Sequence, residues 1–228
     1  MSDIGTLNEK PLHAALKKWA AKDGAQFEVK IDGYFIDVVQ GELLIEIQTG
    51  NFASIKSKLT KLTEARRVRL VYPIAAEKWL IKLPKNENDK IIRRKSPKRG
   101  RVEDLFWQMV SFPTLLDNPN FSLQVVLTQE EEIRRFDPSL NWRRHNWGIA
   151  ERRLIEVIDT VIFEAPADWL GMLPEKLKDF TTKDLAKELG IPLKLAQKMA
   201  YCLRETNVIE VIGKQGRANL YRVRGTSD

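Results

Sequence analysis

The chain has 228 residues, of which 43% are hydrophobic and 30% charged, so it can form a packed core and does not have the composition of a disordered protein. One cysteine and two histidines exclude an intramolecular disulfide and a multi-cysteine zinc site, and they favour a carboxylate site for a hard ion such as Mg²⁺ or Mn²⁺. The formal net charge of +7 suits a polyanionic partner such as DNA.

Length and hydropathy predict a two-domain protein. The chain is longer than one minimal domain, and we expect a core of residues 1–165 followed by a smaller domain of residues 166–228. No stretch approaches the roughly 20 apolar residues of a membrane helix, and the opening MSDIGTLNEK lacks the apolar run of a signal peptide. We therefore expect a soluble, cytoplasmic protein.

The first predicted elements are a helix and three strands. An amphipathic helix is expected to begin at Pro11 and to stop before Gly24. Residues 27–49 are rich in β-branched and aromatic side chains and are broken at Asp32-Gly33 and Gln40-Gly41, both of which are hairpin-turn signals. This pattern predicts three consecutive antiparallel strands.

A second helix and another strand follow. Ile55, Leu59 and Leu62 share one face of a helix that starts near Asn51, and the segment VRLVYPI then reads as a strand. The order helix, three strands, helix, strand indicates a mixed α/β core with a crossover connection.

Later elements are assigned from the same signals. WLIKL and KIIRR are expected to form a further hairpin, and FSLQVVLTQEEEIRRF one long strand. Residues 101–113 are predicted to be helical. Residues 141–163 are arginine-rich and then amphipathic, which predicts a loop that leads into a helix.

Two basic segments are candidates for contact with DNA. The run from Lys90 to Arg101 contains no acidic residue and is interrupted by a proline and a glycine, so it is either a solvated loop or a phosphate-binding surface. Trp142 and Trp147 alternate with basic residues and either stack on bases or pack in the core. The candidate DNA-binding residues of these segments are Arg93, Arg94, Lys95, Lys98, Arg99, Arg143 and Arg144.

Two acidic residues on neighbouring strands form the candidate catalytic centre. If the strands pair across the Gln40-Gly41 turn, Asp37 and Glu46 come close together, and Gln48 points to the same face as Glu46. Two carboxylates held so close repel each other unless a cation lies between them. The other interpretation is an ordinary solvent-facing pair at a sheet edge.

An acidic residue, a short hairpin and then Glu-x-Gln resembles the PD-(D/E)xK motif of restriction-endonuclease-like nucleases, in the variant with glutamine in place of the last lysine. The resemblance covers roughly residues 5 to 83 and implies a restriction-endonuclease-like fold, with a mixed β-sheet core flanked by helices. It further implies a metal-dependent deoxyribonuclease.

The resemblance also implies roles for individual residues. Asp37, Glu46 and the backbone carbonyl of Ile47 would bind Mg²⁺ or Mn²⁺, and Glu9 on the first helix would bind the metal or orient its water. Gln48 can orient a water but cannot supply a positive charge. Lys56 or Lys58 on the next helix would supply that charge instead. His13, one helical turn from Glu9, either faces the site or is a half-buried polar residue.

The C-terminal segment resembles a winged helix over residues 180–223. Thr181 or Thr182 caps a first helix, Gly190 ends it, and a second helix and a basic hairpin follow. The resemblance implies a recognition helix and a wing that contact DNA, although such a unit also serves as a protein-interaction module. The implied contacts are Lys194, Gln197, Lys198, Arg204, Lys214, Gln215 and Arg217.

Three functions follow from these patterns. The first is a DNA endonuclease targeted by the winged helix, in which double-strand cleavage by one metal centre would favour a homodimer. The second is a catalytically inactive DNA-binding protein on a nuclease-like scaffold, with Gln48 marking the lost chemistry. The third is a protein-interaction adaptor, for which binding to DNA would be weak.

Overall fold

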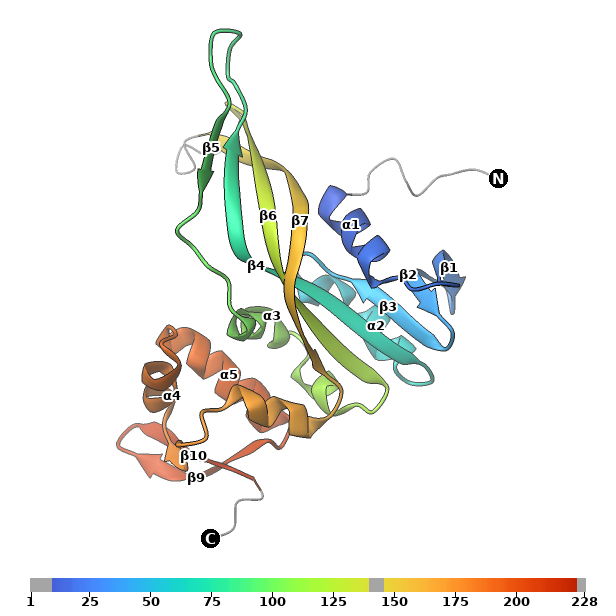
Figure 1. Cartoon of the computed structure of the whole chain (residues 1–228). Helices are drawn as coiled ribbons and strands as arrows, with labels where there is room; N and C mark the ends of the chain where they lie inside the picture. Colours follow the sequence, from blue (N-terminus) through green and yellow to red (C-terminus); the bar gives the residue numbers. More distant parts are fainter. Residues whose placement is uncertain (1–9, 140–145, 225–228) are drawn as a thin grey trace.

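The computed structural model describes residues 10–139 and 146–224. These residues form a mixed α/β protein: a mixed sheet is flanked by helices, and a smaller unit of helices and a three-stranded sheet lies at its lower left (Figure 1). Within the two described ranges, no helix is both long enough and apolar enough to cross a membrane.

The large sheet has the strand order β1-β2-β3-β4-β6-β7, with β5 paired to the far part of β4. β3, β4 and β6 run parallel to one another, and the other neighbours are antiparallel. Its strands are β1 (Gln26–Ile31), β2 (Tyr34–Gln40), β3 (Leu43–Ile47), β4 (Arg67–Lys82), β5 (Ile92–Lys95), β6 (Phe121–Phe136) and β7 (Trp147–Phe163).

The predicted first helix and strand meander are confirmed. α1 (Pro11–Ala20) has its proline in the first turn and ends four residues before Gly24. Asp32 and Gly33 both have positive φ and join β1 to β2, as a tight hairpin of this twist requires. β2 and β3 are joined by the two residues that follow Gln40, since Gln40 pairs with Leu43.

The crossover from β3 to β4 is also confirmed. Asn51 accepts a hydrogen bond from the Ala53 N–H and so caps η2 (Phe52–Ile55), a short 3-10 helix. α2 (Lys56–Leu62) continues from it, and its Leu59 and Leu62 are fully buried. The parallel pairing of β3 with β4 follows from this helical connection.

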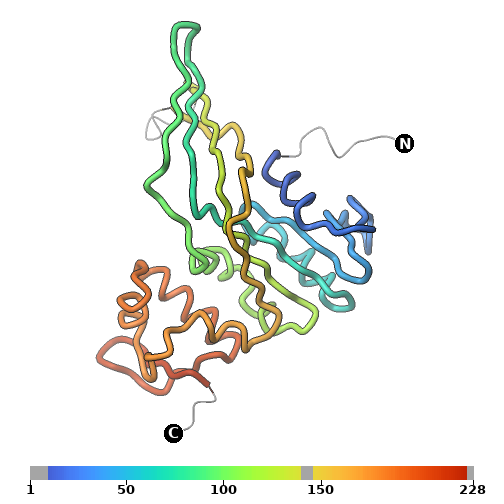
Figure 2. The backbone as a smooth tube through the Cα atoms, viewed as in Figure 1, coloured from blue at the N-terminus to red at the C-terminus, as the bar shows by residue number. Residues whose placement is uncertain are grey.

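β4 is longer than predicted. The two strands expected in VRLVYPI and WLIKL are one strand of 16 residues, because Ala75 and Ala76 continue the pairing with β6 through a bulge. The predicted hairpin with β5 is confirmed at its far end. We call this extension, residues 77–99, 131–136 and 147–151, the arm; Figures 1 and 2 show it rising above the helices.

The prediction of a helix before Phe163 is wrong, because the described residues of that segment form the 17-residue strand β7. Its pairing with β6 leaves Ala150, Ile155 and Ile158 as extra residues at three bulges. Each bulge shifts the alternation of side chains by one position. Apolar residues therefore fall at positions 154, 155, 157, 158, 161 and 162, which is the spacing of an amphipathic helix.

The helix predicted over residues 101–113 is present only in short pieces. These are η3 (Val102–Leu105), α3 (Phe106–Met109) and η4 (Pro113–Asp117). Their apolar side chains are buried under one face of the sheet together with α2. The opposite face is covered by α1, whose Leu12 and Leu16 pack with Val38, Ile45 and Ile47.

The smaller unit has the predicted order of helix, helix and hairpin. Thr181 caps α4 and exchanges hydrogen bonds with Asp184, and Gly190 ends the helix in the left-handed conformation. Gly216, also at positive φ, lies in the turn of the final hairpin. The elements are β8 (Asp179–Phe180), α4 (Thr182–Leu189), α5 (Leu193–Glu205), β9 (Ile209–Gln215) and β10 (Ala218–Val223).

This unit packs firmly on the large sheet. η6 (Pro166–Met172) follows β7, and its Trp169 stacks on Phe163 with ring centroids 3.9 Å apart. Apolar residues of α5 share one buried cluster with α3 and η4. Arg101 Nη1 also donates to the Leu189 carbonyl oxygen at 2.8 Å, so polar contacts reinforce the apolar interface.

Candidate active site

Asp37 and Glu46 meet where β2 and β3 separate. The last paired residues are Val38 and Ile45, and one further step along each strand places Asp37 opposite Glu46. Beyond this point the Asp37 side chain replaces the strand pairing, because its Oδ2 accepts a hydrogen bond from the Ile47 N–H at 2.7 Å. The structure therefore brings the two predicted acids together.

Glu46 is a buried carboxylate with one unsatisfied oxygen. The residue is only 5% exposed, Oε2 lies 2.6 Å from Lys58 Nζ, and Oε1 has no hydrogen-bond partner among the described residues. Burial and the nearby charge of Asp37 raise the pKa of Glu46 to about 7, against the opposing effect of Lys58. An unpartnered buried oxygen is costly for the fold, and a bound cation would satisfy it.

Asp37 is held in its ionised form. Burial acts to raise its pKa, but hydrogen bonds from His13 and from the Ile47 N–H, together with the Lys58 charge, hold the pKa below its ordinary value. His13 Nε2 lies 3.3 Å from Asp37 Oδ2. Of the two interpretations of His13, the structure supports the one in which it faces the site.

The site draws on helices from both faces of the sheet. His13 belongs to α1 and contacts Asp37, whereas Lys58 belongs to α2 and contacts Glu46. Lys58 Nζ also donates to the Phe35 carbonyl oxygen at 2.6 Å. Lys58 thus reaches the site, whereas Lys56 is exposed and has no ion pair to either carboxylate.

Gln48 is engaged in the turn that follows β3. Its Nε2 donates to the Asn51 carbonyl oxygen at 2.6 Å and to Ser54 Oγ at 3.0 Å. The amide therefore fixes the start of the crossover helix. Gln48 stands where the resemblance would place a lysine, but its amide N–H donors are used in this turn.

The oxygen donors fit a hard divalent ion. Asp37, Glu46 and the Ile47 carbonyl could bind Mg²⁺ or Mn²⁺, ions that retain several waters and need few protein ligands. Residues 10–139 and 146–224 contain no group of three or more His, Cys, Asp or Glu side chains placed to hold a metal. Glu9, the remaining predicted ligand, lies outside the described residues.

Residues 90–99 of the basic run lie on the arm, and part of their charge is neutralised there. Glu77 forms ion pairs with Lys95 and Arg99, at 2.7 and 3.5 Å. Arg93 pairs with Glu131 and stacks over Trp79. The exposed Arg94 and Lys98 have no ion pair with any described residue, so their charge is available to a phosphate.

Trp147 packs on the arm near the outer ends of β6 and β7. Its ring meets Phe136 edge-on, and Lys82 and Lys85 lie over it at 4.7 and 5.5 Å from the centroid. This is the packing role among the two that the sequence left open. Trp142, Arg143 and Arg144 lie outside the described residues.

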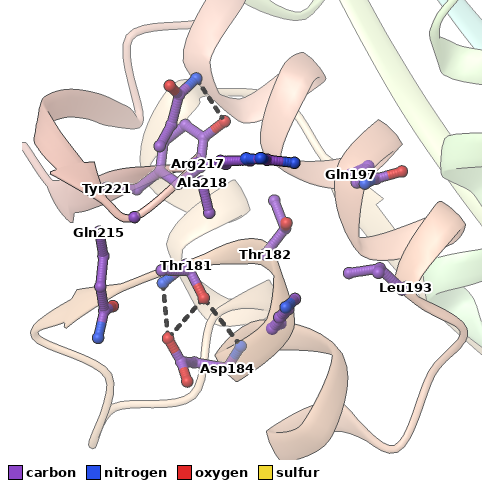
Figure 3. Close-up of a pocket in the computed structure, with 12 residues that line it drawn as sticks. Thr181, Thr182, Asp184, Leu193, Gln197, Gln215, Arg217, Ala218 and Tyr221 are labelled. Carbon is purple, nitrogen blue, oxygen red and sulfur yellow. Dashed lines mark hydrogen bonds between the residues drawn. The ribbon is translucent and has the colours of Figure 1, made fainter.

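A groove of about 830 Å³ lies in the C-terminal unit (Figure 3). It is bounded by the start of α4, by one side of α5 and by the final hairpin, and Arg217 extends across it from the hairpin. Gln197, Gln215 and Arg217 are the predicted DNA contacts that line it. Lys194 and Lys214 are exposed outside it.

Two other predicted contacts of α5 are partly engaged. Lys198 lies over the Trp107 ring of α3, 5.7 Å from the centroid. Arg204 pairs with Glu205 at 2.6 Å. Both side chains are half-buried, so they have less freedom to reach a partner than the exposed residues of the groove.

Sequence reasoning missed a polar pair beside the site. Glu130 on β6 is completely buried and binds Arg152 of β7, which also donates to the Thr49 carbonyl oxygen at 3.3 Å. The available signal was the acidic residue at an inward position of a predicted strand, since a buried carboxylate requires a partner.

The geometry defines a mixed α/β protein in which a buried glutamate and a partly buried aspartate meet where β2 and β3 separate. The chain belongs to the family described as Domain of unknown function (DUF8091), which matches residues 10–164. It is 30% identical over 222 residues to an uncharacterized protein of Treponema pallidum (strain Nichols), an alignment that covers 96% of this chain and 87% of that protein. No solved structure matches.

Proposed function

We propose that this protein is a metal-dependent endonuclease that hydrolyses phosphodiester bonds in DNA. The observation that carries the proposal is the buried Glu46 Oε1, which has no hydrogen-bond partner within residues 10–139 and 146–224 and lies near the ionised Asp37. A purely structural carboxylate would be expected to have both oxygens satisfied. A poised acceptor next to a second carboxylate is the expected arrangement for an oxygen-ligated cation site.

Asp37, Glu46 and the Ile47 carbonyl would hold Mg²⁺ or Mn²⁺. When bound there, such an ion lowers the pKa of a coordinated water and stabilises negative charge on a phosphate. The Ile47 N–H and His13 orient the Asp37 carboxylate, which keeps one oxygen directed at these two donors. Ion pairing with Lys58 orients Glu46 in the same way.

Lys58 supplies the positive charge that Gln48 lacks. Its ammonium forms an ion pair with Glu46 and also acts electrostatically on Asp37, so its charge reaches both carboxylates. In the proposed site it offsets the repulsion between the carboxylates before a cation binds. It also adds positive charge where the scissile phosphate would lie.

Two surfaces would bind the DNA duplex. The arm offers Arg94 and Lys98 for phosphates, and the C-terminal unit offers the groove around Gln197 and Arg217. We infer that this unit is a winged helix, because its two helices and basic hairpin have the matching order. Its firm packing on the sheet would hold the two surfaces in a fixed relation.

A cleavage assay with matched variants tests the proposal. Wild-type protein should cut DNA with Mg²⁺ or Mn²⁺, whereas Asp37→Ala and Glu46→Ala should bind DNA without cutting it. Glu42→Ala is the control, because Glu42 is an exposed acid in the same hairpin. If the wild type binds duplex, single-stranded and branched DNA but cuts none with either ion, the inactive DNA-binding scaffold is the better account. Absence of DNA binding would favour the adaptor.

A further inference from the structure

A second buried carboxylate lies on the α1 face of the sheet. Alternation along β6 places Glu130 on the same face as Val126, which packs under α1. Thr128 Oγ1 donates to Glu130 Oε1 at 2.7 Å, and Arg152 donates to both oxygens through Nε at 2.9 Å and Nη2 at 3.0 Å. This paired contact fixes the plane of the guanidinium.

The guanidinium contacts the segment that directly follows the candidate active site in the chain. Arg152 Nη1 donates to the Thr49 carbonyl oxygen at 3.3 Å, and Thr49 directly follows Gln48. β4 and β6 lie between β3 and β7 in the sheet, so this contact joins two segments that the sheet order keeps apart. Arg152 is therefore brought from a distant strand to the segment that carries the Ile47 carbonyl.

Arg152 retains hydrogen-bonding capacity on its exposed side. A guanidinium has five N–H donors. Three of them are engaged by Glu130 and Thr49, which leaves two without a partner among the described residues. The side chain is 26% exposed although the carboxylate that anchors it is fully buried. A cation with fixed orientation and free donors is suited to a phosphate.

We propose that Arg152 binds a phosphate of the DNA strand at the Asp37–Glu46 site, and that Glu130 and Thr128 hold its guanidinium in place. The identity of the ligand rests on the proposed function. The arrangement gives the site a second cation besides Lys58. It also places positive charge one residue beyond Gln48, whose own donors are engaged by Asn51 and Ser54.

The salt dependence of DNA binding tests this contact. Binding of the full-length protein to a short fluorescent duplex is measured in EDTA over a series of salt concentrations, so that cleavage cannot interfere. Loss of one phosphate contact should reduce the slope of log K against log salt concentration by about 0.9. We expect this change for Arg152→Ala and no change for Arg153→Ala.

Arg153 is a matched control. It is the next residue of β7, so its side chain points to the other face of the sheet, and it is 56% exposed and paired with Glu151. Both variants remove one positive charge from the same strand. An unchanged slope for Arg152→Ala, or an equal change in both variants, would overturn the proposal.

A second variant guards against misfolding, since Arg152→Ala leaves Glu130 buried without its partner. Arg152→Gln combined with Glu130→Gln removes both charges and keeps an amide pair, and it should show the same loss of slope. The readout is independent of catalysis. If Arg152 contributes to the slope but wild type never cleaves DNA, the endonuclease proposal fails and the phosphate contact stands. If wild type cleaves DNA and Arg152→Ala leaves the slope unchanged, the phosphate contact of Arg152 fails and the endonuclease proposal stands.

Discussion

Glu46 and Glu130 are both buried acids of the large sheet, but their surroundings differ in one respect. Glu130 has both oxygens satisfied by Arg152 and Thr128, whereas Glu46 has Lys58 on one oxygen and, in the described part of the chain, no partner on the other. The first arrangement anchors a neighbouring side chain. The second leaves an acceptor available inside the protein, which is useful only if something else binds there.

The incomplete pairing of Glu46 is accompanied by a raised pKa. Proximity to Asp37 and burial raise the pKa of Glu46 to about 7, so near neutral pH this carboxyl is close to half protonated without a cation. A bound divalent ion would displace that proton. Metal binding at this site should therefore strengthen as pH rises through 7.

The largest expected effect concerns cleavage. Glu46→Gln removes the negative charge and one carboxylate oxygen, and it should lower the rate of Mg²⁺-dependent DNA cleavage by about 1000-fold, equivalent to about 4 kcal/mol of lost transition-state stabilisation. Single-turnover rates measure this, and Glu42→Gln, in the exposed hairpin turn, should leave them unchanged. A Glu46→Gln protein that retains the wild-type rate would contradict the assignment of this carboxylate.

The next effect concerns the stability of the fold around Glu130. Arg152→Ala leaves Glu130 buried without its ion-pair partner, so the free energy of unfolding should fall by about 4 kcal/mol. Arg153→Ala removes an exposed ion pair with Glu151 and should cost less than about 1 kcal/mol. Urea denaturation distinguishes the two, and equal losses would show that Glu130 does not depend on Arg152.

The pH dependence of metal-free protein tests the raised pKa of Glu46. Because its folded pKa, about 7, exceeds the ordinary 4.5, the protonated acid contributes stability that is fully present below pH 4.5 and is lost as pH rises through 7. The wild type should therefore lose about 3 kcal/mol relative to Glu46→Gln between these values. Denaturation at several pH values measures the difference, and a constant difference would contradict the shift.

A surface carboxylate supplies the smallest effect. The exposed Asp184 accepts two local bonds on one oxygen, Oδ2, from the Thr181 N–H and hydroxyl at the start of α4. Asp184→Ala should cost about 1 kcal/mol, the usual value for a helix cap. Thermal unfolding of the full chain measures this. A loss of unfolding free energy as large as that of Arg152→Ala would show that the cost does not depend on how deeply the carboxylate is buried.

The sequence was informative where local signals dominate. Turn residues and alternation predicted the β1-β2-β3 meander, and with it the meeting of Asp37 and Glu46 across one hairpin. Helical spacing placed Lys56 and Lys58 on the same element. The sequence pattern does not distinguish Lys56 from Lys58. The position of α2 in the folded protein decides that Lys58 contacts Glu46.

The failures have a common physical cause in long-range pairing. Three bulges in β7 give this strand the apolar spacing of an amphipathic helix. Arg152, which contacts Thr49, was therefore predicted to lie in a helix. The partnership of Arg152 with Glu130 spans 22 positions along the chain, and no local pattern specifies it. Register between distant strands is set by tertiary packing rather than by neighbouring residues.

The most direct measurement is anomalous diffraction from a crystal of the protein soaked in Mn²⁺. The account predicts an anomalous peak between the carboxylates of Asp37 and Glu46, with Glu46 Oε1 as one of its ligands, and no such peak at Glu130. A map in which Mn²⁺ is absent from this position, with Glu46 Oε1 still without a partner, would contradict the assignment of the site as a metal centre.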